Sequence, residues 1–412
     1  MKSFDALVIG AGPAGAAAAL MLARAGWSVA VVEKARFPRR KVCGEFISAP
    51  SLALLRELGI AAPFLARAGP EIRQIGLYAG ETMLAADMPC PRDGLDMRGR
   101  ALGREHFDAL VLACAAKAGA EVWQPWTLTR LERTAGGFDC TAVAKETKET
   151  TRLRARIIIA AHGSWERGML PTQHIRHPPR ASDLFAFKAH FRNGDLPLGL
   201  MPLVVFPGGY GGIVQSDGGR TGFSCCIRRD HLEQCRRQWR QARAAEAVFA
   251  HVRAACRGVE TAFSRATCDG SWLSAGPIRP GIRTFRSDGI FTVGNAAGEA
   301  HPLVAEGISM AIQSAWLLCE HLLARRNAVF SERAVAEIGR DYAASWRRNF
   351  ACRVFAAATF AHVAMRPATA RPVTALLTRA PSILTVGAYL SGKTQPLSGL
   401  RNENRKSGAA FR

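Results

Sequence analysis

A chain of 412 residues with 48% hydrophobic composition is long enough to bury one large core or two intergrown domains. Its formal net charge of +22 favours an anionic partner, but the basic residues are scattered and form no long run with interleaved aromatics, so nucleic-acid binding is not expected. The eleven cysteines are irregularly spaced without a CxxC pair, which predicts neither a metal site nor a disulfide framework and favours a reducing, cytoplasmic setting.

The first 33 residues predict a strand, a glycine turn, a helix and a second strand, in that order. Residues 4–9 are mostly apolar, as is typical of a buried parallel strand. Residues 14–25 are strong helix formers that follow Pro13, and residues 28–32 form a second apolar run that ends at Glu33. Together they predict a βαβ unit of the kind that binds a dinucleotide.

The turn of this unit carries the pattern G-x-G-x-x-G. Gly10 permits the tight turn, Gly12 lets a diphosphate approach the backbone, and Gly15 lets helix and strand pack closely. The positive end of the helix would face the phosphates, and Glu33 is expected to accept hydrogen bonds from ribose hydroxyls. By itself the pattern does not separate NAD from FAD. The predicted cofactor contacts in this unit are Gly10, Gly12, Pro13, Ala14, Gly15, Glu33 and Lys34.

Helices and strands alternate through the next part of the chain, beginning with a cationic loop over residues 37–51. A short helix is predicted over 52–58 and an amphipathic helix over 105–118. Strands are predicted in the region from about 70 to 96, over 120–123 and over 156–161.

The composition changes after Gly163, where a domain crossing is expected. Alternating strands occupy 183–274, interrupted by one long charged helix over 231–257. An apolar strand over 289–293 and a helix over 309–325 return the chain to the nucleotide-binding part. Residues 342–392 are helical in pattern and rich in alanine, with isolated arginines.

A second glycine-rich motif follows the strand at 289–293. It reads Gly294-Asn295-Ala-Ala-Gly298, with Pro302 and Glu306-Gly307-Ile308 downstream. Arg104, which precedes Phe107-Asp108, and the segment Lys41-Val-Cys43-Gly44 lie between the two motifs in the sequence.

Together these motifs resemble the flavoprotein superfamily that includes aromatic hydroxylases, such as p-hydroxybenzoate hydroxylase, and geranylgeranyl reductases. The resemblance implies FAD as the cofactor, with Arg104 near its phosphate and ribityl region and the second motif on the ribityl chain and the flavin ring. The helix that follows would aim its positive end at the flavin. The further cofactor contacts that it implies are Lys41, Cys43, Gly44, Arg104, Gly163, Gly294, Asn295, Gly307 and Ile308.

Several residues depart from the family pattern. Asn295 stands where the family has a ribityl-binding aspartate, and His162 stands where its middle motif has an aspartate. The segment from Tyr210 to Gln215 lacks the aromatic and proline elements of the prenyl-reductase segment Tyr-x-Trp-x-Phe-Pro, which weakens double-bond reduction as the activity. The Trp-x-Trp-x-Ile-Pro segment of flavin halogenases is also missing.

The implied fold is α/β, a glutathione-reductase-type FAD-binding Rossmann fold with an inserted mixed or antiparallel substrate sheet and a helical C-terminal region. We assign residues 1–70, 97–175 and 276–335 to the FAD-binding domain and residues 71–96 and 176–275 to the substrate domain. Residues 336–412 form the helical C-terminal region.

The resemblance favours an NAD(P)H-using FAD monooxygenase that hydroxylates a hydrophobic, electron-rich compound, such as an aromatic polyketide or an alkylphenol lipid. Two alternatives stay open: a flavin reductase or dehydrogenase of an isoprenoid or polyketide double bond, and a non-catalytic flavin-binding protein. His301 is a candidate acid or base, Glu306 either transfers protons or braces its loop, and Cys43 has either a redox role or a packing role.

The C-terminal region has two interpretations. It is either a helical cap on the core or an amphipathic surface that rests on a membrane or covers a channel for a lipid-like substrate. The basic charge would assist attraction to anionic lipids, so the protein is expected in the cytoplasm or peripherally on the inner face of the membrane.

Overall fold

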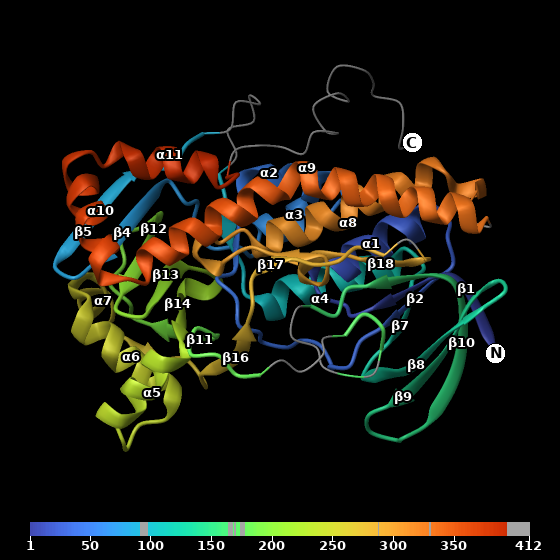
Figure 1. Cartoon of the computed structure of the whole chain (residues 1–412), viewed down its shortest axis with the longest axis horizontal. Helices are drawn as coiled ribbons and strands as arrows, with labels where there is room; N and C mark the ends of the chain where they lie inside the picture. The colour runs from blue at the N-terminus through green and yellow to red at the C-terminus, as the bar shows by residue number, and fades with distance from the viewer. Residues whose placement is uncertain are drawn as a thin grey trace.

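The computed structural model describes residues 1–90, 98–163, 168, 170–173, 178–286, 288–328 and 331–393. Two sheets lie side by side along the long axis of the molecule, and one long helix, α9 (Glu332–Ala364), extends over both (Figure 1). The architecture is α/β, as the sequence predicts.

The first sheet contains the predicted βαβ unit. Its parallel part has the order β7-β2-β1-β10-β18, so strands from distant parts of the chain end at one common edge. The loop after β1 carries the first glycine motif, and the loop after β18 carries the second. The strands are β1 (Lys2–Ile9), β2 (Val29–Val32), β7 (Glu121–Trp123), β10 (Thr150–Ala160) and β18 (Ile290–Thr292).

An antiparallel hairpin that the sequence analysis did not predict extends this sheet. Strands β8 (Trp126–Thr134) and β9 (Gly137–Ala144) pair with each other, and β9 pairs with the first half of β10. β9 buries every second residue, whereas β8 buries only Leu128 and carries several charged side chains. The half-polar pattern of β8 explains why this hairpin was missed.

Helices pack on the first sheet around one large apolar core. The small side chains of α1 (Pro13–Arg24) allow both α4 (Arg104–Lys117) and α8 (Gly307–Ala324) to approach it closely. These three helices match the predicted ones to within two residues at each end. The remaining helices of this part are α2 (Ala49–Glu57) and α3 (Ala61–Leu65).

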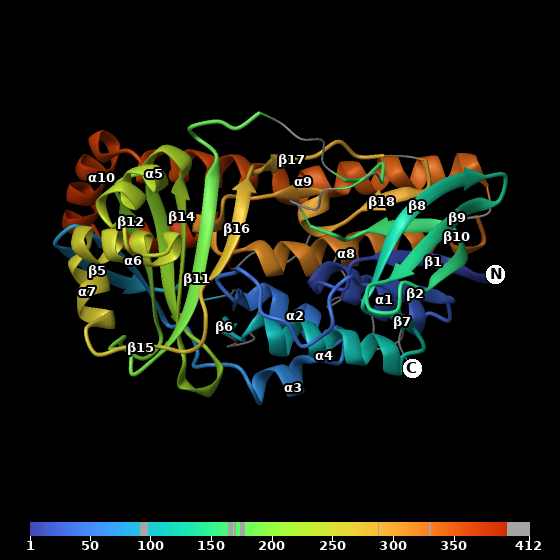
Figure 2. The ribbon, with the colours of Figure 1, turned by 90° about the horizontal axis from the view of Figure 1, so that it is seen from below.

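The second sheet is mixed, as predicted. Its order is β15-β11-β14-β13-β12-β4-β5, with β16 also on β11, and only the β12–β4 pair is parallel (Figure 2). The strands are β4 (Gln74–Ala79), β5 (Thr82–Asp87), β11 (Leu184–Arg192), β12 (Leu200–Phe206), β13 (Gly209–Gln215), β14 (Thr221–Arg228), β15 (Thr267–Cys268) and β16 (Leu273–Ile278).

The single charged helix predicted over 231–257 is wrong. The segment forms α5 (Arg229–Gln238), α6 (Ala244–Ala255) and α7 (Arg257–Phe263), which together cover one face of the second sheet. The Glu246 carboxylate accepts a hydrogen bond from the Arg243 amide at 2.9 Å, which fixes the start of α6. The chain reverses because Cys235 on α5 and Val248 on α6 are both buried in the same core.

The C-terminal helices connect the two sheets. Helix α9 packs on α8 through Tyr342, Trp346 and Phe350, and its end reaches β13. Helices α10 (Pro367–Arg379) and α11 (Ser382–Leu390) then lie against the second sheet (Figure 1). Within the described residues no single helix is long and apolar enough to cross a membrane, although the α10–α11 pair, bent by 116°, passes that test when taken together.

Short elements complete the fold between the two sheets. Two small antiparallel pairs, β3 with β6 and β17 with β19, lie in the connections. Their bounds are β3 (Phe46–Ile47), β6 (Arg100–Ala101), β17 (Gly281–Ile282) and β19 (Gly298–Glu299), and single 3-10 turns occupy Asp217–Gly219, Gly294–Ala296, Pro302–Val304 and Arg326–Ala328.

Candidate functional site

A cavity that opens to solvent runs from the first glycine turn to the inner face of the second sheet. Among the residues predicted from the sequence, those that line it are Gly12, Pro13, Ala14, Lys41, Cys43, Gly44, Arg104, Gly163, Gly294, Asn295, His301, Gly307 and Ile308. Those that do not are Gly10, Gly15, Glu33, Lys34 and Glu306.

The three glycines of the first turn have different structural roles. Gly10 has a φ of +98°, and a Cβ there would lie 2.8 Å from the Ala161 carbonyl oxygen. A Cβ on Gly15 would lie 1.9 Å from the Gly10 oxygen, so both positions require glycine for folding. A Cβ on Gly12 would meet nothing closer than the Arg104 Nη2 atom at 3.9 Å. Gly12 therefore leaves space toward the cavity.

Two long helices begin at this cavity. Gly12 precedes the first residue of α1, and Glu306 precedes the first residue of α8. Neither N-terminus is capped by a side-chain hydrogen bond, and Gly307 has open space around its Cα. The free N–H groups and positive dipole ends of both helices are therefore available to anionic or electron-rich parts of a ligand.

Basic side chains surround the first turn. Arg104 donates two hydrogen bonds of 2.7 Å to the Asp108 carboxylate, and Arg39 lies 3.5 Å from the same carboxylate. Burial, followed by repulsion from Arg104 and Arg39, lowers the pKa of Lys41 to about 8. Glu33, also buried, lies 3.9 Å from Arg39, so three cations beside two buried carboxylates leave a surplus of positive charge, as a diphosphate site requires. Arg39 was not predicted, although the run Arg39-Arg40-Lys41 was a usable signal.

Glu33 lies at the end of β2 and shapes the turn. Its carboxylate accepts hydrogen bonds from the Ala11 amide at 2.8 Å and from the Ala35 amide at 2.9 Å. The side chain is only 4% exposed. Glu33 therefore links the glycine turn to the loop after β2, and its contact with ribose stays a prediction. Lys34, the next residue, is exposed.

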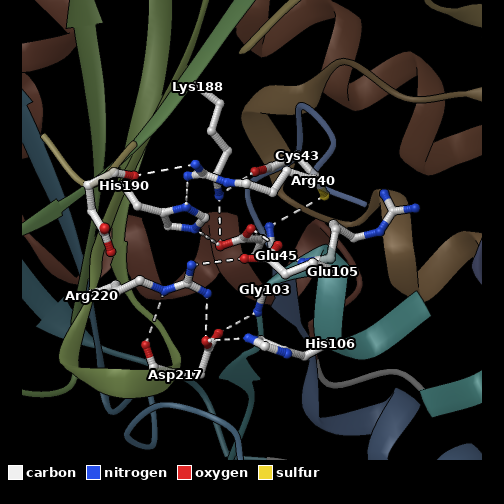
Figure 3. A network of polar contacts seen from close by, with 12 residues as sticks. Arg40, Cys43, Glu45, Gly103, Glu105, His106, Lys188, His190, Asp217 and Arg220 are labelled. Carbon is white, nitrogen blue, oxygen red and sulfur yellow. Dashed lines mark hydrogen bonds and ion pairs between the residues drawn. The ribbon is translucent and has the colours of Figure 1, made fainter. Parts of the chain in front are cut away.

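A buried polar network joins the loop at 40–45 to the second sheet (Figure 3). The Glu45 carboxylate contacts Lys188 Nζ at 2.7 Å and His190 Nε2 at 2.8 Å, and Lys188 also donates to the Cys43 carbonyl at 2.8 Å. Arg40 Nη2 lies 2.5 Å from His190 Nδ1. Because arginine can only donate, Nδ1 accepts and the Nε2–H group donates to Glu45.

This network fixes a loop of unusual conformation. Glu45 has a φ of +64°, in the left-handed region that disfavours a side chain. Although burial favours the neutral acid, Lys188 and His190 hold the pKa of Glu45 well below its usual range. Cys43 and Glu45 both line the cavity, so the ion pair sets the position of the wall between the two sheets. The sequence analysis missed Glu45, Lys188 and His190.

On the second-sheet side, Tyr210 and His301 face each other across the cavity wall. The Tyr210 hydroxyl lies 3.1 Å from His301 Nδ1, and the His301 and His362 rings are 6.0 Å apart. Burial, followed by the charge of His362, lowers the pKa of His301 to about 4. Burial, with smaller contributions from Cys226 and Glu299, raises the pKa of Tyr210 well above its usual value. His301 is therefore neutral near pH 7 and Tyr210 keeps its proton.

The other two catalytic candidates have structural contacts. Glu306 is buried and accepts hydrogen bonds from Ser48 at 3.0 Å and from Lys393 at 3.2 Å. It braces the start of α8 from outside the cavity. The Cys43 sulfur accepts a hydrogen bond from the Glu45 amide at 3.3 Å. His162, where the family has an aspartate, lies 3.1 Å from the Gly163 carbonyl oxygen through Nδ1.

Comparison with known proteins identifies the family. A model of the FAD binding domain family matches residues 3–357. The chain belongs to this family. The two uncapped helix ends, the space at Gly12 and the basic cluster are features suited to the diphosphate of FAD.

Curated relatives match mainly over part of their length. A menaquinone reductase from Mycolicibacterium smegmatis is 37% identical over 118 residues, which are 29% of this chain and 28% of that protein. Digeranylgeranylglycerophospholipid reductase from Thermoplasma acidophilum is 31% identical over 166 residues, 40% of each chain. Conditioned medium factor receptor 1 from Dictyostelium discoideum is 25% identical over 374 residues, covering 84% of this chain and 68% of that one.

Solved structures share the fold over nearly the whole chain. The myxobacterial chondrochloren halogenase CndH has a TM-score of 0.76 at 19% identity, covering 95% of this chain and 91% of its own. The Pseudomonas aeruginosa protein PqsL, in complex with 2-aminobenzoylacetate, has a TM-score of 0.67 at 16% identity and covers 92% and 100%. At such identities the likeness shows the fold alone.

Proposed function

We propose that this protein is an FAD- and NAD(P)H-dependent monooxygenase that hydroxylates a lipophilic, electron-rich compound, such as an aromatic polyketide or an alkylphenol lipid. The observation that carries the proposal is the Tyr210–His301 pair at the substrate end of the cavity. At neutral pH His301 is unprotonated and Tyr210 holds its proton, so this pair has no proton to release readily.

The first-sheet side of the cavity would hold FAD. The N-terminus of α1, with Lys41 and Arg104, would bind the diphosphate, and Asn295 would donate or accept a hydrogen bond at the ribityl chain. The N-terminus of α8 would stabilise negative charge on the flavin ring. When bound, FAD supplies electron transfer and oxygen activation.

The second-sheet side would hold the substrate. Its lining is largely apolar and includes Met201, Leu203, Ile213, Val214, Ile278 and Leu303. Such a wall binds a hydrophobic compound by removing its surface from water, and it excludes water from the reacting atoms. Lys188 and Glu45 satisfy each other, so their charges do not oppose an apolar ligand.

The acid–base properties of the pair separate hydroxylation from double-bond reduction. A phenol becomes more acidic as its ring gives electrons to oxygen, and the hydrogen-bonded Tyr210–His301 pair can accept a hydrogen bond from the phenol and orient it without having to release a proton. Reduction of a carbon–carbon double bond requires a group that delivers a proton to carbon. With the pKa of His301 lowered and that of Tyr210 raised, neither group is a good proton donor at neutral pH, which counts against reduction more than against hydroxylation.

A second candidate is a reductase of an isoprenoid double bond. It is supported by the relatives named menaquinone reductase and digeranylgeranylglycerophospholipid reductase. Those matches span at most 40% of this chain, and the prenyl-reductase aromatic segment is replaced by Tyr210-Gly-Gly-Ile-Val-Gln215. We therefore rank it below hydroxylation.

Anaerobic reduction followed by oxygen tests the proposal. The FAD-loaded protein is mixed with NADPH or NADH and a panel of alkylphenols, and the visible spectrum is followed before and after oxygen is admitted. Hydroxylation predicts oxygen-dependent product that has gained one oxygen atom. Product that has gained two hydrogens without oxygen would replace this proposal with the reductase, and failure of both nicotinamides to bleach the flavin would favour a non-catalytic role.

A further inference from the structure

The α10–α11 helix pair exposes a large apolar surface. Eight of the eleven large apolar side chains exposed in the described part of the chain lie between residues 355 and 390. Leu376, Val386 and Leu390 are each more than half exposed. Exposed apolar side chains gathered on adjacent helices mark an interaction site. On this helix pair they are Val373, Leu376, Ile383, Val386, Tyr389 and Leu390.

The same region carries only positive formal charge. Residues 342–393 include six arginines and one lysine but no aspartate or glutamate. Arg366, Arg371 and Arg379 are exposed at the ends and on the surface of α10. Arginine side chains can extend from an apolar surface toward phosphate groups while their methylenes stay in apolar contact. The surface is therefore complementary to an anionic lipid layer.

The inner side of the helix pair packs behind the wall at the substrate end of the cavity, although neither helix lines the cavity itself. Leu377, Leu384 and Ala388 are buried in a cluster with Phe46, Met201, Val214 and Ala305, and these four also line the cavity. At the end of α11, Lys393 donates to the Val304 carbonyl at 2.7 Å, next to the start of α8. The helix pair is thus one layer between the cavity and the outside.

The shape of the helix pair favours lying on a membrane. Helices of 13 and 9 residues are about 20 Å and 14 Å long, and the bend of 116° between them prevents a straight span. Two short helices joined at such an angle can place their apolar faces in the headgroup region while their polar ends stay hydrated. α10 buries only Leu377, so its outer surface is free for this contact.

From this arrangement we infer that α10 and α11 dock the enzyme on an anionic membrane surface, with the substrate end of the cavity directed at the lipid. Docking would let a lipophilic substrate pass from the bilayer to the cavity without crossing water. The link to substrate rests on the proposed function, whereas the docking itself does not.

Flotation with vesicles tests the docking. The FAD-loaded full chain is mixed with vesicles of phosphatidylcholine, with or without phosphatidylglycerol. We expect binding to the anionic vesicles that weakens as salt is raised. Changing Arg366, Arg371 and Arg379 together to glutamine should weaken binding at least tenfold, because each arginine near such a surface contributes about five-fold. The variant Leu376→Glu with Val386→Glu should remove binding.

Matched variants on α5 and just after it control for net charge. Changing Arg236, Arg237 and Arg240 to glutamine removes the same charge from exposed positions, and α5 lies on the opposite side of the second sheet from α10 and α11 (Figure 1). These variants should bind like the unchanged protein. Equal loss in both arginine sets, equal binding to neutral vesicles, or absence of binding would each overturn the docking. Self-association that the Leu376→Glu and Val386→Glu changes abolish, without vesicle binding, would assign the surface to a second copy instead.

Turnover of a short, water-soluble phenol separates docking from chemistry. The α10–α11 variants should keep this turnover, since their changed side chains lie outside the cavity. If turnover is absent in the unchanged protein as well as in the variants, while vesicle binding follows the pattern above, the proposed function fails and the docking stands.

Discussion

The two halves of the cavity are built in different ways. The first-sheet half includes short contiguous motifs after β1 and β18, where glycines and backbone groups line the cavity. The second-sheet half is formed by single side chains from separate strands, such as Lys188 on β11 and Tyr210 on β13. Backbone geometry can be recognised from spacing, whereas a pair such as Tyr210 and His301 exists only after folding.

The largest expected effect distinguishes Gly15, which the turn needs for folding, from Gly12, which leaves space for the cofactor. Gly15→Ala places a Cβ 1.9 Å from a backbone oxygen, so we expect a cost above about 4 kcal/mol and loss of folded protein. Gly12→Ala meets no close atom and should leave the melting temperature of the FAD-free protein unchanged. Because its methyl group would occupy diphosphate space, FAD affinity should fall at least about 100-fold.

Calorimetry measures the melting temperatures of the two glycine variants, and FAD fluorescence titration measures their affinity for FAD. If Gly12→Ala lost as much stability as Gly15→Ala, Gly12 would be required for folding and not for cofactor binding. Full FAD affinity in Gly12→Ala would contradict the position assigned to the diphosphate.

The second prediction concerns the joint between the halves. Lys188→Met leaves the Glu45 carboxylate buried without its strongest partner, so unfolding free energy should fall by about 3–5 kcal/mol in chemical denaturation. Lys188→Met combined with Glu45→Gln should recover part of this loss, because no unpaired charge remains. An exposed pair, Arg130 and Glu132, serves as control, and its removal should change stability by less than about 1 kcal/mol. Equal costs at both pairs would contradict the buried role of Lys188.

The predictable part of the molecule follows this division. The βαβ unit, α4, α8 and the family were predictable because strand, turn and helix signals are local and adjacent. The break between α5 and α6 was not, since burial of both Cys235 and Val248 in one core forces the chain to turn. Glu45 was missed because its partners lie more than 140 residues away on β11.

The third prediction tests the substrate half. His301→Ala should lower the hydroxylation rate about 100-fold, with FAD affinity unchanged. With its pKa lowered to about 4, His301 stays neutral above pH 5, so the rate should be flat from pH 6 to 8. His362→Gln removes a nearby charge and should keep that plateau while moving its acidic limb to higher pH. A rate that falls as pH rises from 6 to 8 would show that a protonated group acts as an acid in the reaction, which supports the reductase.

The smallest effect is expected from Lys41 in the first-sheet half. Its pKa is lowered to about 8 in the FAD-free chain by burial and by Arg104 and Arg39, and a bound diphosphate would favour the protonated form. FAD affinity should therefore be constant below pH 8 and fall by up to about tenfold from pH 8 to 9, because binding then requires proton uptake. Lys41→Met should bind FAD more weakly without this pH dependence, while Lys34→Met, at an exposed position, should keep it. A pH dependence that survives in Lys41→Met would place the titrating group elsewhere and remove Lys41 from the diphosphate site.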